Sequence, residues 1–376
     1  MKLASFNVEN LFQRAHAMNL ANQSDGKGVL QKHAEMNRIL SKTHYTAADK
    51  TKIVSLMKDL GIDKRDDGGE FVILRQNRGH LVKRPSSGGL QVVANGRGDW
   101  IGWLDLKMEA VNEVSTRMTA RVINDVAADV IALVEAESRP SLVKFHDDVQ
   151  TLTTPTMPHV VSYDHIMLID GNDDRGIDVS LMARGGFHID LIRSHVDDEK
   201  NGNRIFSRDC AEYHLTTPAN DRLIVLVNHF KSKGFGSQSA NNAKRKAQAE
   251  RVKAIYEDLR NGGASNVAVV GDFNDTPNSN PLAPLLQNTD LEDISKHPNF
   301  DDQGRPGTFG NGTASNKIDY ILLSPSLFAK ATGGSIFRMG VWGGTNGTLF
   351  AHFPEITKAA EAASDHAAIV ADIQLA

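Results

Sequence analysis

The 376-residue chain contains a single cysteine, Cys210, which excludes an intrachain disulfide framework and a metal site made of cysteines alone. So few cysteines are typical of a reducing compartment. No charge sign is in large excess either, since 42 lysines and arginines stand against 46 aspartates and glutamates. The net charge of −4 argues against a protein that coats nucleic acid through bulk electrostatics, but it leaves room for a local basic groove.

Long hydrophobic runs are also absent. No stretch approaches the length of a membrane span, and the N-terminal residues, MKLASFNVENLFQR, contain no apolar core of signal-peptide length. The composition, 40% hydrophobic and 23% charged, is that of a globular protein. We therefore expect a cytoplasmic protein without a membrane partner and without an obligate protein partner.

Short apolar runs recur, and each ends in polar residues. They are KLASFNVEN (2–10), DVIALVEAE (129–137), DVSLMAR (178–184), LIVLVNHF (223–230), NVAVVGDFND (266–275), KIDYILLS (317–324) and HAAIVADIQL (366–375). Strands bounded in this way, with helices between some of them, predict an α/β architecture. Apolar spacing predicts one helix over 104–127, and a run of helix formers predicts another over 240–260.

The second predicted helix is rich in basic residues, namely Lys244, Arg245, Lys246, Arg251 and Lys253. A nucleic-acid contact is one interpretation of them. We favour a solvated helix face, because Glu250, Glu257 and Asp258 are interspersed.

Residues 13–103 form an insert with a different pattern. Its first part is polar and helical, and from residue 70 the turn signals QNRG, PSSGG and NGRG indicate a β-meander. Between residues 71 and 99 the lysines and arginines are Arg75, Arg78, Lys83, Arg84 and Arg97, with Asp99 as the one acidic residue. They predict either a flap that contacts nucleic-acid phosphates or charges that keep an exposed edge strand soluble. Trp100 and Trp103 are interpreted either as residues that stack on bases or as anchors of a core, and we favour the core.

Polar side chains gather at the ends of the predicted strands. They are Asn7, Glu9, Glu135, Asn228, His229, Asp272, Asn274, Asp365 and His366. A single Asn or Asp after a strand is usually a turn former or a helix cap. Turn chemistry does not explain carboxylates, amides and two histidines after separate strands. Because strand ends of α/β sheets are where side chains converge on ligands, we interpret these residues as one site.

The oxygen groups of this set suit a hard cation. Glu135, Asp272 and Asp365 offer carboxylates, and Asn7 and Asn274 add amide oxygens, which fits Mg²⁺ or Mn²⁺. Zinc is disfavoured, because no local His-rich spacing stands out. Two histidines and nearby cationic side chains complete a site for a phosphate ester, since positive charge stabilises the charge that develops on oxygen.

At this point the sequence resembles the endonuclease/exonuclease/phosphatase superfamily, which includes deoxyribonuclease I, exonuclease III-type apurinic endonucleases, neutral sphingomyelinases and inositol-polyphosphate 5-phosphatases. The matching motifs, in the family's order, are SFNVENLF (5–12), DVIALVEAES (129–138), RGIDVSLMAR (175–184), LVNHFKSKG (226–234), GDFNDTP (271–277), NKIDYILLS (316–324) and SDHAAIVADI (364–373). The resemblance implies a four-layer α/β sandwich, two packed mixed sheets flanked by helices, with the active site at one rim. The resemblance implies that residues 1–376 form a single domain of this family, with an atypical insert at about 13–103. The matching motifs cover most of the chain outside that insert.

The resemblance also implies roles for residues of this chain. Glu135 would be the principal metal ligand, with Asn7 beside it, Glu9 as a neighbour and Asp365 as a further ligand. Asp272 would orient or deprotonate the attacking water and contribute to the metal site.

The remaining roles concern the phosphate. Asn274 would help to place the phosphate or a second metal, and His366, oriented by Asp319, would contact the phosphate. A carboxylate behind an imidazole favours the protonated ring. His229 would donate toward the phosphate or the leaving group. The residues that would bind non-bridging oxygens are Arg175, Lys231 and Asn228.

This chain departs from the family's pattern in three places, one of which is the insert at 13–103. The family often has Leu-Gln-Glu where this chain has Leu133, Val134 and Glu135, so the glutamine is absent. Residues 175–184 contain no tyrosine, which favours a two-histidine, deoxyribonuclease I-like branch over the apurinic endonucleases. The insert is expected to set substrate choice.

The predicted function is a divalent-metal-dependent phosphodiesterase, in which water activated by the metal and Asp272 attacks phosphorus. A nuclease acting on DNA, or else on RNA, is the first alternative. A phosphoesterase for a small phosphorylated metabolite or a phospholipid headgroup is the second, and the absence of an amphipathic apolar stretch weakens its lipid version. A catalytically inactive binding module is the third. It is disfavoured because Glu135, Asp272, Asp319, Asp365 and His366 are all in place.

Overall fold

The computed structural model describes residues 1–11, 15–18, 23–108, 112–173, 176–234 and 236–375. The chain divides into two compact units, one made of residues 1–12 and 112–376 and the other of residues 13–111. The motifs at the strand ends all belong to the first unit, which is described first.

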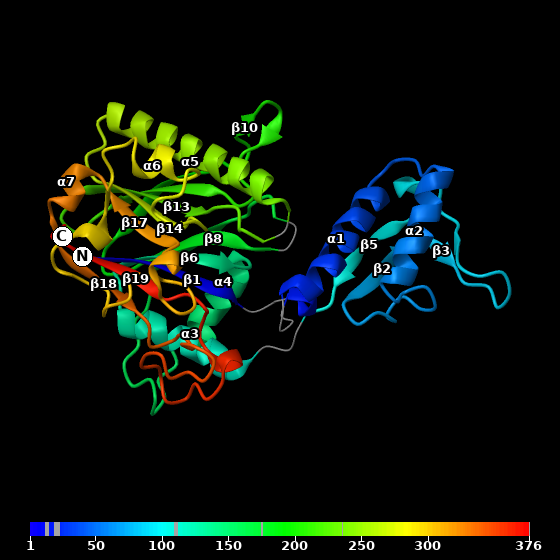
Figure 1. Ribbon diagram of the computed structural model, residues 1–376, viewed down its shortest axis with the longest axis horizontal. Coiled ribbons are helices and arrows are strands. Elements are labelled where there is room, and N and C mark those ends of the chain that lie inside the picture. The colour runs from blue at the N-terminus through cyan, green and yellow to red at the C-terminus, as the bar shows by residue number, and fades with distance from the viewer. Residues whose placement is uncertain (12–14, 19–22, 109–111, 174–175, 235, 376) are drawn as a thin grey trace. The chain divides into compact units, whose positions relative to one another are not determined.

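The first unit contains two mixed β-sheets (Figure 1). The seven-stranded sheet has the order β16 (Phe300–Asp301), β18 (Ala331–Phe337), β19 (Ala368–Ile373), β1 (Lys2–Leu11), β6 (Val130–Ala136), β8 (Asp178–Ala183) and β7 (His165–Ile169). The six-stranded sheet has the order β15 (Glu292–Asp293), β17 (Asp319–Leu323), β14 (Val267–Asp272), β13 (Arg222–His229), β12 (Cys210–Thr216) and β9 (His188–Arg193). Each sheet joins its two motif-bearing central strands in parallel, β1 with β6 and β13 with β14.

Strand alternation divides the apolar residues of these sheets among three cores. One core lies between the sheets and takes alternate residues such as Val225 and Val227 of β13 and Val130 and Ala132 of β6. The outer face of the seven-stranded sheet packs against α3 (Glu113–Val126) and α4 (Arg139–Phe145), and that of the six-stranded sheet against α5 (Gln238–Asn261) and α6 (Ala283–Leu286). The unit is therefore a four-layer α/β sandwich (Figure 1).

The predicted helix over 240–260 is confirmed by α5. The helix predicted over 104–127 is wrong in its first part, because residues up to 106 belong to strand β5 (Ile101–Leu106) and α3 begins at Glu113. In that strand Leu104 and Leu106 are buried by two-residue alternation, which a short apolar stretch does not distinguish from helical spacing. Asn112 caps α3, since its side chain accepts from two backbone amides of the first turn.

The second unit has its own core. Helices α1 (Gln23–Leu40) and α2 (Ala47–Asp59) pack against the ribbon formed by β2 (Val72–Arg78) and β5, and a small hairpin of β3 (Val82–Lys83) and β4 (Gln91–Val92) lies between these strands in sequence. The pairing is nested, β2 with β5 and β3 with β4, so the predicted meander is wrong. Trp100 is buried and its Nε1 donates to the Tyr45 hydroxyl at 3.0 Å, whereas Trp103 is 43% exposed.

The remaining short elements are η1 (His16–Met18), η2 (Arg97–Asp99), the π-helical turn η3 (His146–Gln150), β10 (Glu199–Lys200), β11 (Asn203–Arg204), η4 (Ile294–Lys296), η5 (Ala314–Asn316), α7 (Pro325–Phe328) and η6 (Ala359–Glu361). Among the described residues, no helix combines the length and the apolar character that a membrane crossing requires.

Candidate active site

Three of the predicted residues form a row across the six-stranded sheet. His229 pairs with Asp272 between β13 and β14, and Asp272 pairs with Asp319 between β14 and β17. Each is an even number of positions from the residues of its own strand that fill the core between the sheets. All three side chains therefore point into the space between the sheets. The row lies where that core ends, which places imidazole and carboxylate groups at one rim of the sandwich.

Glu135 reaches the same space from the seven-stranded sheet because of a β-bulge. Val134 and Ala136 pair with consecutive residues of β8, so Glu135 is the extra residue, and its φ of 69° is in the left-handed region. By simple alternation Glu135 would face outward with Ile131 and Leu133. A bulge re-aims a side chain, and here it turns the carboxylate toward the space between the sheets.

Asn7 of β1 connects the two sheets. Its Nδ2 donates to Glu135 Oε1 at 3.3 Å and to Asp272 Oδ2 at 3.2 Å. The His229 Nε2 atom lies 3.6 Å from the same Glu135 oxygen and 3.7 Å from the same Asp272 oxygen. Residues 7, 135, 229 and 272, far apart in sequence, therefore converge on one point.

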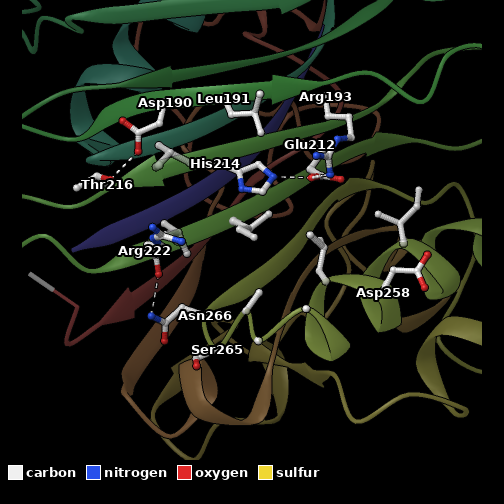
Figure 2. Close-up of a pocket in the computed structure, with 18 of the residues that line it drawn as sticks. Asp190, Leu191, Arg193, Glu212, His214, Thr216, Arg222, Asp258, Ser265 and Asn266 are labelled. Carbon is white, nitrogen blue, oxygen red and sulfur yellow. Dashed lines mark hydrogen bonds and ion pairs between the residues drawn. The ribbon is translucent and has the colours of Figure 1, made fainter.

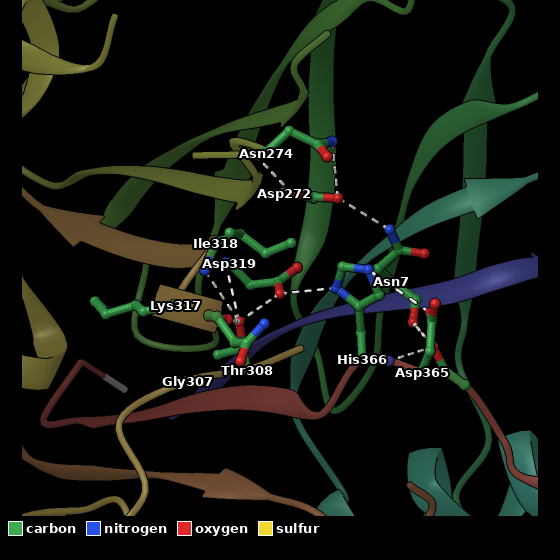
Figure 3. Close-up of polar contacts among 12 residues, drawn as sticks. Asn7, Asp272, Asn274, Gly307, Thr308, Lys317, Ile318, Asp319, Asp365 and His366 are labelled. Carbon is green, nitrogen blue, oxygen red and sulfur yellow. Dashed lines mark hydrogen bonds and ion pairs between the residues drawn. The ribbon is translucent and has the colours of Figure 1, made fainter. Parts of the chain in front are cut away.

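His366 is held by a buried carboxylate. Its Nδ1 bonds with Asp319 Oδ2 at 2.8 Å, and the Thr308 hydroxyl donates to the same oxygen at 2.6 Å (Figure 3). Thr308 Oγ1 in turn accepts from the backbone amide of Asp319 at 3.1 Å. This arrangement leaves Nε2 of His366 as the ring nitrogen available for a ligand, as the pairing with Asp319 predicts.

Thr308 and Ser364 are functional candidates that the sequence did not reveal. The Ser364 hydroxyl donates to the Asn7 carbonyl at 2.7 Å and accepts from the His366 amide at 2.9 Å, so it connects β1 to the segment that precedes β19. Ser364 precedes the Asp-His pair directly, and this adjacency was its sequence signal. Thr308 lies eleven residues before Asp319 in an irregular segment, where nothing local marks it.

Burial and crowding of carboxylates shift the protonation of this site. Burial and the adjacent Asp319 carboxylate raise the pKa of Asp272 to about 8. Burial disfavours the charged form of His366, but the carboxylates of Asp319, Asp365 and Asp272 together outweigh it and raise the pKa of His366 well above its ordinary value. The site thus attracts positive charge, either protons or a cation.

Asp365 and Asn274 lie at the edge of the cluster. Asp365 is the more exposed, with Oδ1 3.7 Å from His366 Nε2, and its amide donates to Glu9 Oε2 at 2.9 Å. Asn274 donates through Nδ2 to Asp272 Oδ2 at 3.0 Å and to the Phe230 carbonyl at 3.2 Å. Glu9 and Asn274 have φ values of 50° and 53°, so with Glu135 three residues of the site have a left-handed backbone conformation. For residues other than glycine this conformation costs free energy, and it is concentrated at functional sites.

The donor set fits a hard divalent cation. Asp272, Asp319 and His366 offer ligand atoms that all lie within 4.8 Å of one another, and Asp319 Oδ1 is buried without a hydrogen-bond partner among the described residues. Glu135 adds a second carboxylate beside Asp272 through their shared contacts with Asn7. Buried carboxylates this close to one another require compensation by positive charge.

The predicted phosphate-binding residues have different positions. Arg175 lies outside the described residues. Lys231 directs its ammonium group to the Gly234 carbonyl at 2.9 Å, within its own loop. Asn228 is fully buried, its Nδ2 donates to the Leu226 carbonyl at 3.1 Å, and alternation turns it to the face opposite His229. Phosphate contact by Asn228 stays a prediction, and this geometry disfavours it.

The basic residues of the insert are only partly available. Arg84 pairs with Asp66 at 2.7 Å and donates to backbone carbonyls, and Arg97 donates to the Gly102 carbonyl and lies over the Trp100 ring. Arg75 pairs with Asp105 at 3.2 Å. Arg78 and Lys83 are exposed, and their side chains form no hydrogen bond or ion pair within the part of the chain that the structure describes, so the prediction of nucleic-acid contact depends mainly on these two residues.

A separate cavity of about 1080 Å³ opens on the six-stranded sheet (Figure 2). It lies near the Thr216–Arg222 pair, at the ends of β12 and β13 opposite His229. The charged groups of its wall bind one another, since Glu212 accepts from Arg193 at 2.9 Å and lies 3.1 Å from His195 Nε2. The cavity shares no lining residue with the cluster around Asp272.

A four-layer α/β sandwich with clustered carboxylates and two histidines at its rim defines a hydrolase of phosphoric esters. The sequence model of the Endonuclease/Exonuclease/phosphatase family matches residues 93–332, more than half of the chain. The chain belongs to the endonuclease/exonuclease/phosphatase family. Asn7, Asp365 and His366 lie outside the matched range.

Comparison with solved structures agrees with this fold. A mannosyl-6-phosphatase of Bacteroides thetaiotaomicron superposes with a TM-score of 0.51 at 15% sequence identity, covering 69% of this chain and 91% of that chain. An endonuclease/exonuclease/phosphatase of Bacteroides vulgatus superposes with a TM-score of 0.50 at 16% identity, covering 70% of this chain and 91% of that chain. At these identities the likeness shows the fold alone. None of the curated proteins compared with the chain matches it.

Proposed function

We propose that this protein is a divalent-metal-dependent phosphodiesterase that hydrolyses its substrate by attack of water on phosphorus. The observation that supports this best is the convergence of Asn7, Glu135 and His229 on Asp272, with Asp319 and His366 in the same cluster. Carboxylates and imidazoles gathered around one point suit in-line displacement at a phosphate, where positive charge must stabilise oxygen.

Asp272 is the proposed acceptor of the proton from the attacking water. Its Oδ1 accepts from the Asn274 amide at 2.7 Å, and its Oδ2 accepts from Asn7 and Asn274. These bonds hold the carboxylate in one orientation, as a general base requires. A base whose pKa lies near the working pH holds and releases a proton readily, and burial moves Asp272 in that direction.

The two histidines serve the phosphate and the leaving group in this proposal. His366, bonded through Nδ1 to Asp319, presents its other nitrogen as a donor to a non-bridging oxygen. His229 is nearly fully buried and faces both Glu135 and Asp272, which supports a role as donor of a proton to the departing oxygen. Asn274 and Lys231 lie on the adjoining loops and are proposed to position the phosphate.

Glu135, Asp272, Asn7 and Asp365 are the proposed ligands of Mg²⁺ or Mn²⁺. A bound divalent ion of this kind neutralises charge on the phosphate oxygens. The oxygen-rich donor set favours these ions over softer metals.

A nucleic acid, with DNA favoured over RNA, is the proposed substrate, because two histidines flank the site and the second unit carries exposed basic residues at Arg78 and Lys83. A phosphorylated metabolite is the second candidate. It draws on the fold neighbour described as a mannosyl-6-phosphatase.

A metal screen tests the proposal. The purified chain, stripped with EDTA, is expected to hydrolyse bis(p-nitrophenyl) phosphate only after Mg²⁺ or Mn²⁺ is restored. Plasmid nicking and release of phosphate from phosphomonoesters, measured side by side, separate the two substrate classes. Undiminished activity in EDTA, or no turnover of any phosphate ester with either metal, contradicts the proposal.

A further inference from the structure

Helix α5 carries three buried polar side chains along one face. Asn241, Arg245 and Gln248 are spaced by four and three residues, so they are neighbours on the helix surface. Arg245 has no exposed surface, although charged side chains are rarely buried unless they are paired. The expectation of a solvated face is therefore wrong at this position, and the buried arginine requires a structural or functional reason.

All three side chains bind the backbone of the loop that follows β13. Arg245 donates to the Lys231 carbonyl at 2.8 Å, and Gln248 Oε1 accepts from the Lys231 amide at 2.9 Å. Asn241 Nδ2 donates to the carbonyls of Lys233 and Gly234, both at 3.1 Å. The loop, residues 230–234, begins directly after His229, so the helix fixes the segment next to the site.

Arg245 also reaches the loop that follows β14. Its Nε donates to Asp275 Oδ2 at 3.0 Å, and the other oxygen of Asp275 pairs with Lys233 at 3.0 Å. Asp275 is adjacent to Asn274, whose side chain bonds with the Phe230 carbonyl. One guanidinium thus links the two loops that border His229 and Asp272.

Aromatic packing beneath the row supports the same link. Phe230 stacks on Phe273, and Phe273 stacks on Tyr320, each at 4.8 Å between ring centroids. Each ring belongs to the residue that follows His229, Asp272 or Asp319. Because neighbouring residues face opposite sides of a strand, the rings lie on the α5 side, where they pack in the same core.

We propose that Arg245 is a positioning residue, which holds the loop of residues 230–234 and the turn at Asn274 in the geometry that binds a substrate phosphate. The inference rests on the proposed phosphodiesterase function. Arg245 is buried and touches no reacting atom. Its fork-shaped group binds two loops at once, a task for which a lysine has too few fixed donors.

Arg245→Met and Arg251→Met form a matched pair for testing this. Both substitutions remove an arginine of α5 that pairs with an aspartate, since Arg251 Nε donates to Asp198 at 2.6 Å, away from the loop. With bis(p-nitrophenyl) phosphate and Mg²⁺, Arg245→Met is expected to raise KM about tenfold, with a smaller change in kcat. Arg251→Met is expected to leave both near the wild-type values. Arg245→Lys is expected to fall between Arg245→Met and wild type.

Gln248→Met provides a second variant if Arg245→Met does not fold, because it removes only the acceptor of the Lys231 amide. It is expected to raise KM in the same direction by a smaller factor. Equal KM values for Arg245→Met, Arg251→Met and wild type would overturn the proposal.

Hydrogen exchange of the Lys231 amide gives a readout that needs no turnover. Arg245→Met is expected to speed this exchange, whereas Arg251→Met is expected to leave it unchanged. If no phosphate ester is hydrolysed by the wild type, the proposed function is contradicted, but hydrogen exchange still tests whether Arg245 holds the loop. If the Lys231 amide exchanges at the same rate in both variants and in the wild type, the proposed role of Arg245 is contradicted whatever the activity.

Discussion

Asp272 and Asp319 lie directly opposite each other on the antiparallel strands β14 and β17, and both carboxylates are buried. Like charges in such a cross-strand pair destabilise a sheet. Burial and this repulsion raise the pKa of Asp272. The carboxylates also raise the pKa of His366, so that a proton on the imidazole compensates part of the negative charge. A sheet with an apolar pair at this position would be more stable, so the pair indicates a site selected for binding positive charge.

The first prediction concerns Asp272→Asn. We expect kcat for bis(p-nitrophenyl) phosphate to fall by about 10²–10⁴-fold, because the amide no longer accepts the proton of the attacking water. The fold is expected to persist, since removing a buried carboxylate next to Asp319 relieves repulsion. Activity is measured alongside thermal unfolding by circular dichroism. A variant that keeps wild-type kcat would exclude the role as general base.

The second prediction concerns the pair of His366 and Asp319. In a double-mutant cycle, His366→Gln and Asp319→Asn are expected to be strongly non-additive in kcat/KM, because the carboxylate acts through the imidazole that it orients. The double variant should lose little more activity than His366→Gln alone. Fully additive losses would show that Asp319 acts on the substrate independently.

The third prediction concerns Thr308. Thr308→Val removes the hydroxyl that donates to Asp319 Oδ2 and accepts from the Asp319 amide. We expect a loss of about 1–3 kcal/mol in the free energy of unfolding, measured with urea, because buried polar groups lose their partner. Thr308→Ser keeps the hydroxyl and should recover most of this loss. A Thr308→Val variant as stable as the wild type would contradict this role of the hydroxyl, because valine keeps the methyl group and removes the hydroxyl alone.

Much of the site was predictable because strand ends are marked in the sequence. His229, Asp272 and Asp319 each end or begin an apolar run, and two-residue alternation with in-register pairing then brings them into one row. Glu135 was identified by its motif alone. Two-residue alternation along β6 would direct its side chain away from the space between the sheets, and only the bulge turns it toward that space. A bulge depends on pairing between strands, which a single sequence does not display.

Other parts required tertiary structure. Arg245 looked like any other basic residue of a solvated helix, because its burial depends on a loop and an aspartate from other segments. Strand β5 was mistaken for helix because a few apolar residues fit both periods. The strands β2 and β5 pair around an intervening hairpin, and such long-range nesting leaves no local signal.

The fourth prediction concerns pH and stability. Burial, with the nearby carboxylates of Asp170 and Asp173, raises the pKa of Asp178 to about 7. The folded state then holds a proton that the unfolded chain releases above about pH 4, so this group makes the free energy of unfolding fall as pH rises from about 4 to 7. Asp178→Asn keeps an oxygen for the Gly171 amide and carries no charge. It should raise the melting temperature at pH 8 and change it little near pH 4.

Asp190→Asn is the control for this, because Asp190 is an exposed carboxylate of β9. Its effect on the melting temperature should be small and similar at both pH values. A gain for Asp178→Asn that is equal at pH 4 and pH 8 would contradict the assignment to a buried, titrating carboxyl.

The last prediction tests the nucleic-acid version of the function through the second unit. Arg78 is exposed at the end of β2 and pairs in register with Ile101, itself exposed, and Trp103 is exposed two residues further along β5. A cation and an exposed indole on the same two-stranded ribbon suit contact with a nucleic-acid backbone and stacking on a base. Arg78→Glu is expected to weaken binding of a single-stranded oligonucleotide, measured in EDTA, by about tenfold or more at low salt, and to reduce the salt dependence of binding.

Lys58→Glu makes the same change of charge on α2, which packs on the opposite, buried face of the ribbon, where Leu74 and Leu104 lie. Binding that responds equally to both substitutions would reflect net charge rather than a docking surface. Both variants should hydrolyse bis(p-nitrophenyl) phosphate at the wild-type rate, because that substrate is too small to need a second contact. If Arg78→Glu leaves oligonucleotide binding unchanged while the catalytic variants behave as expected, nucleic-acid contact by Arg78 is contradicted.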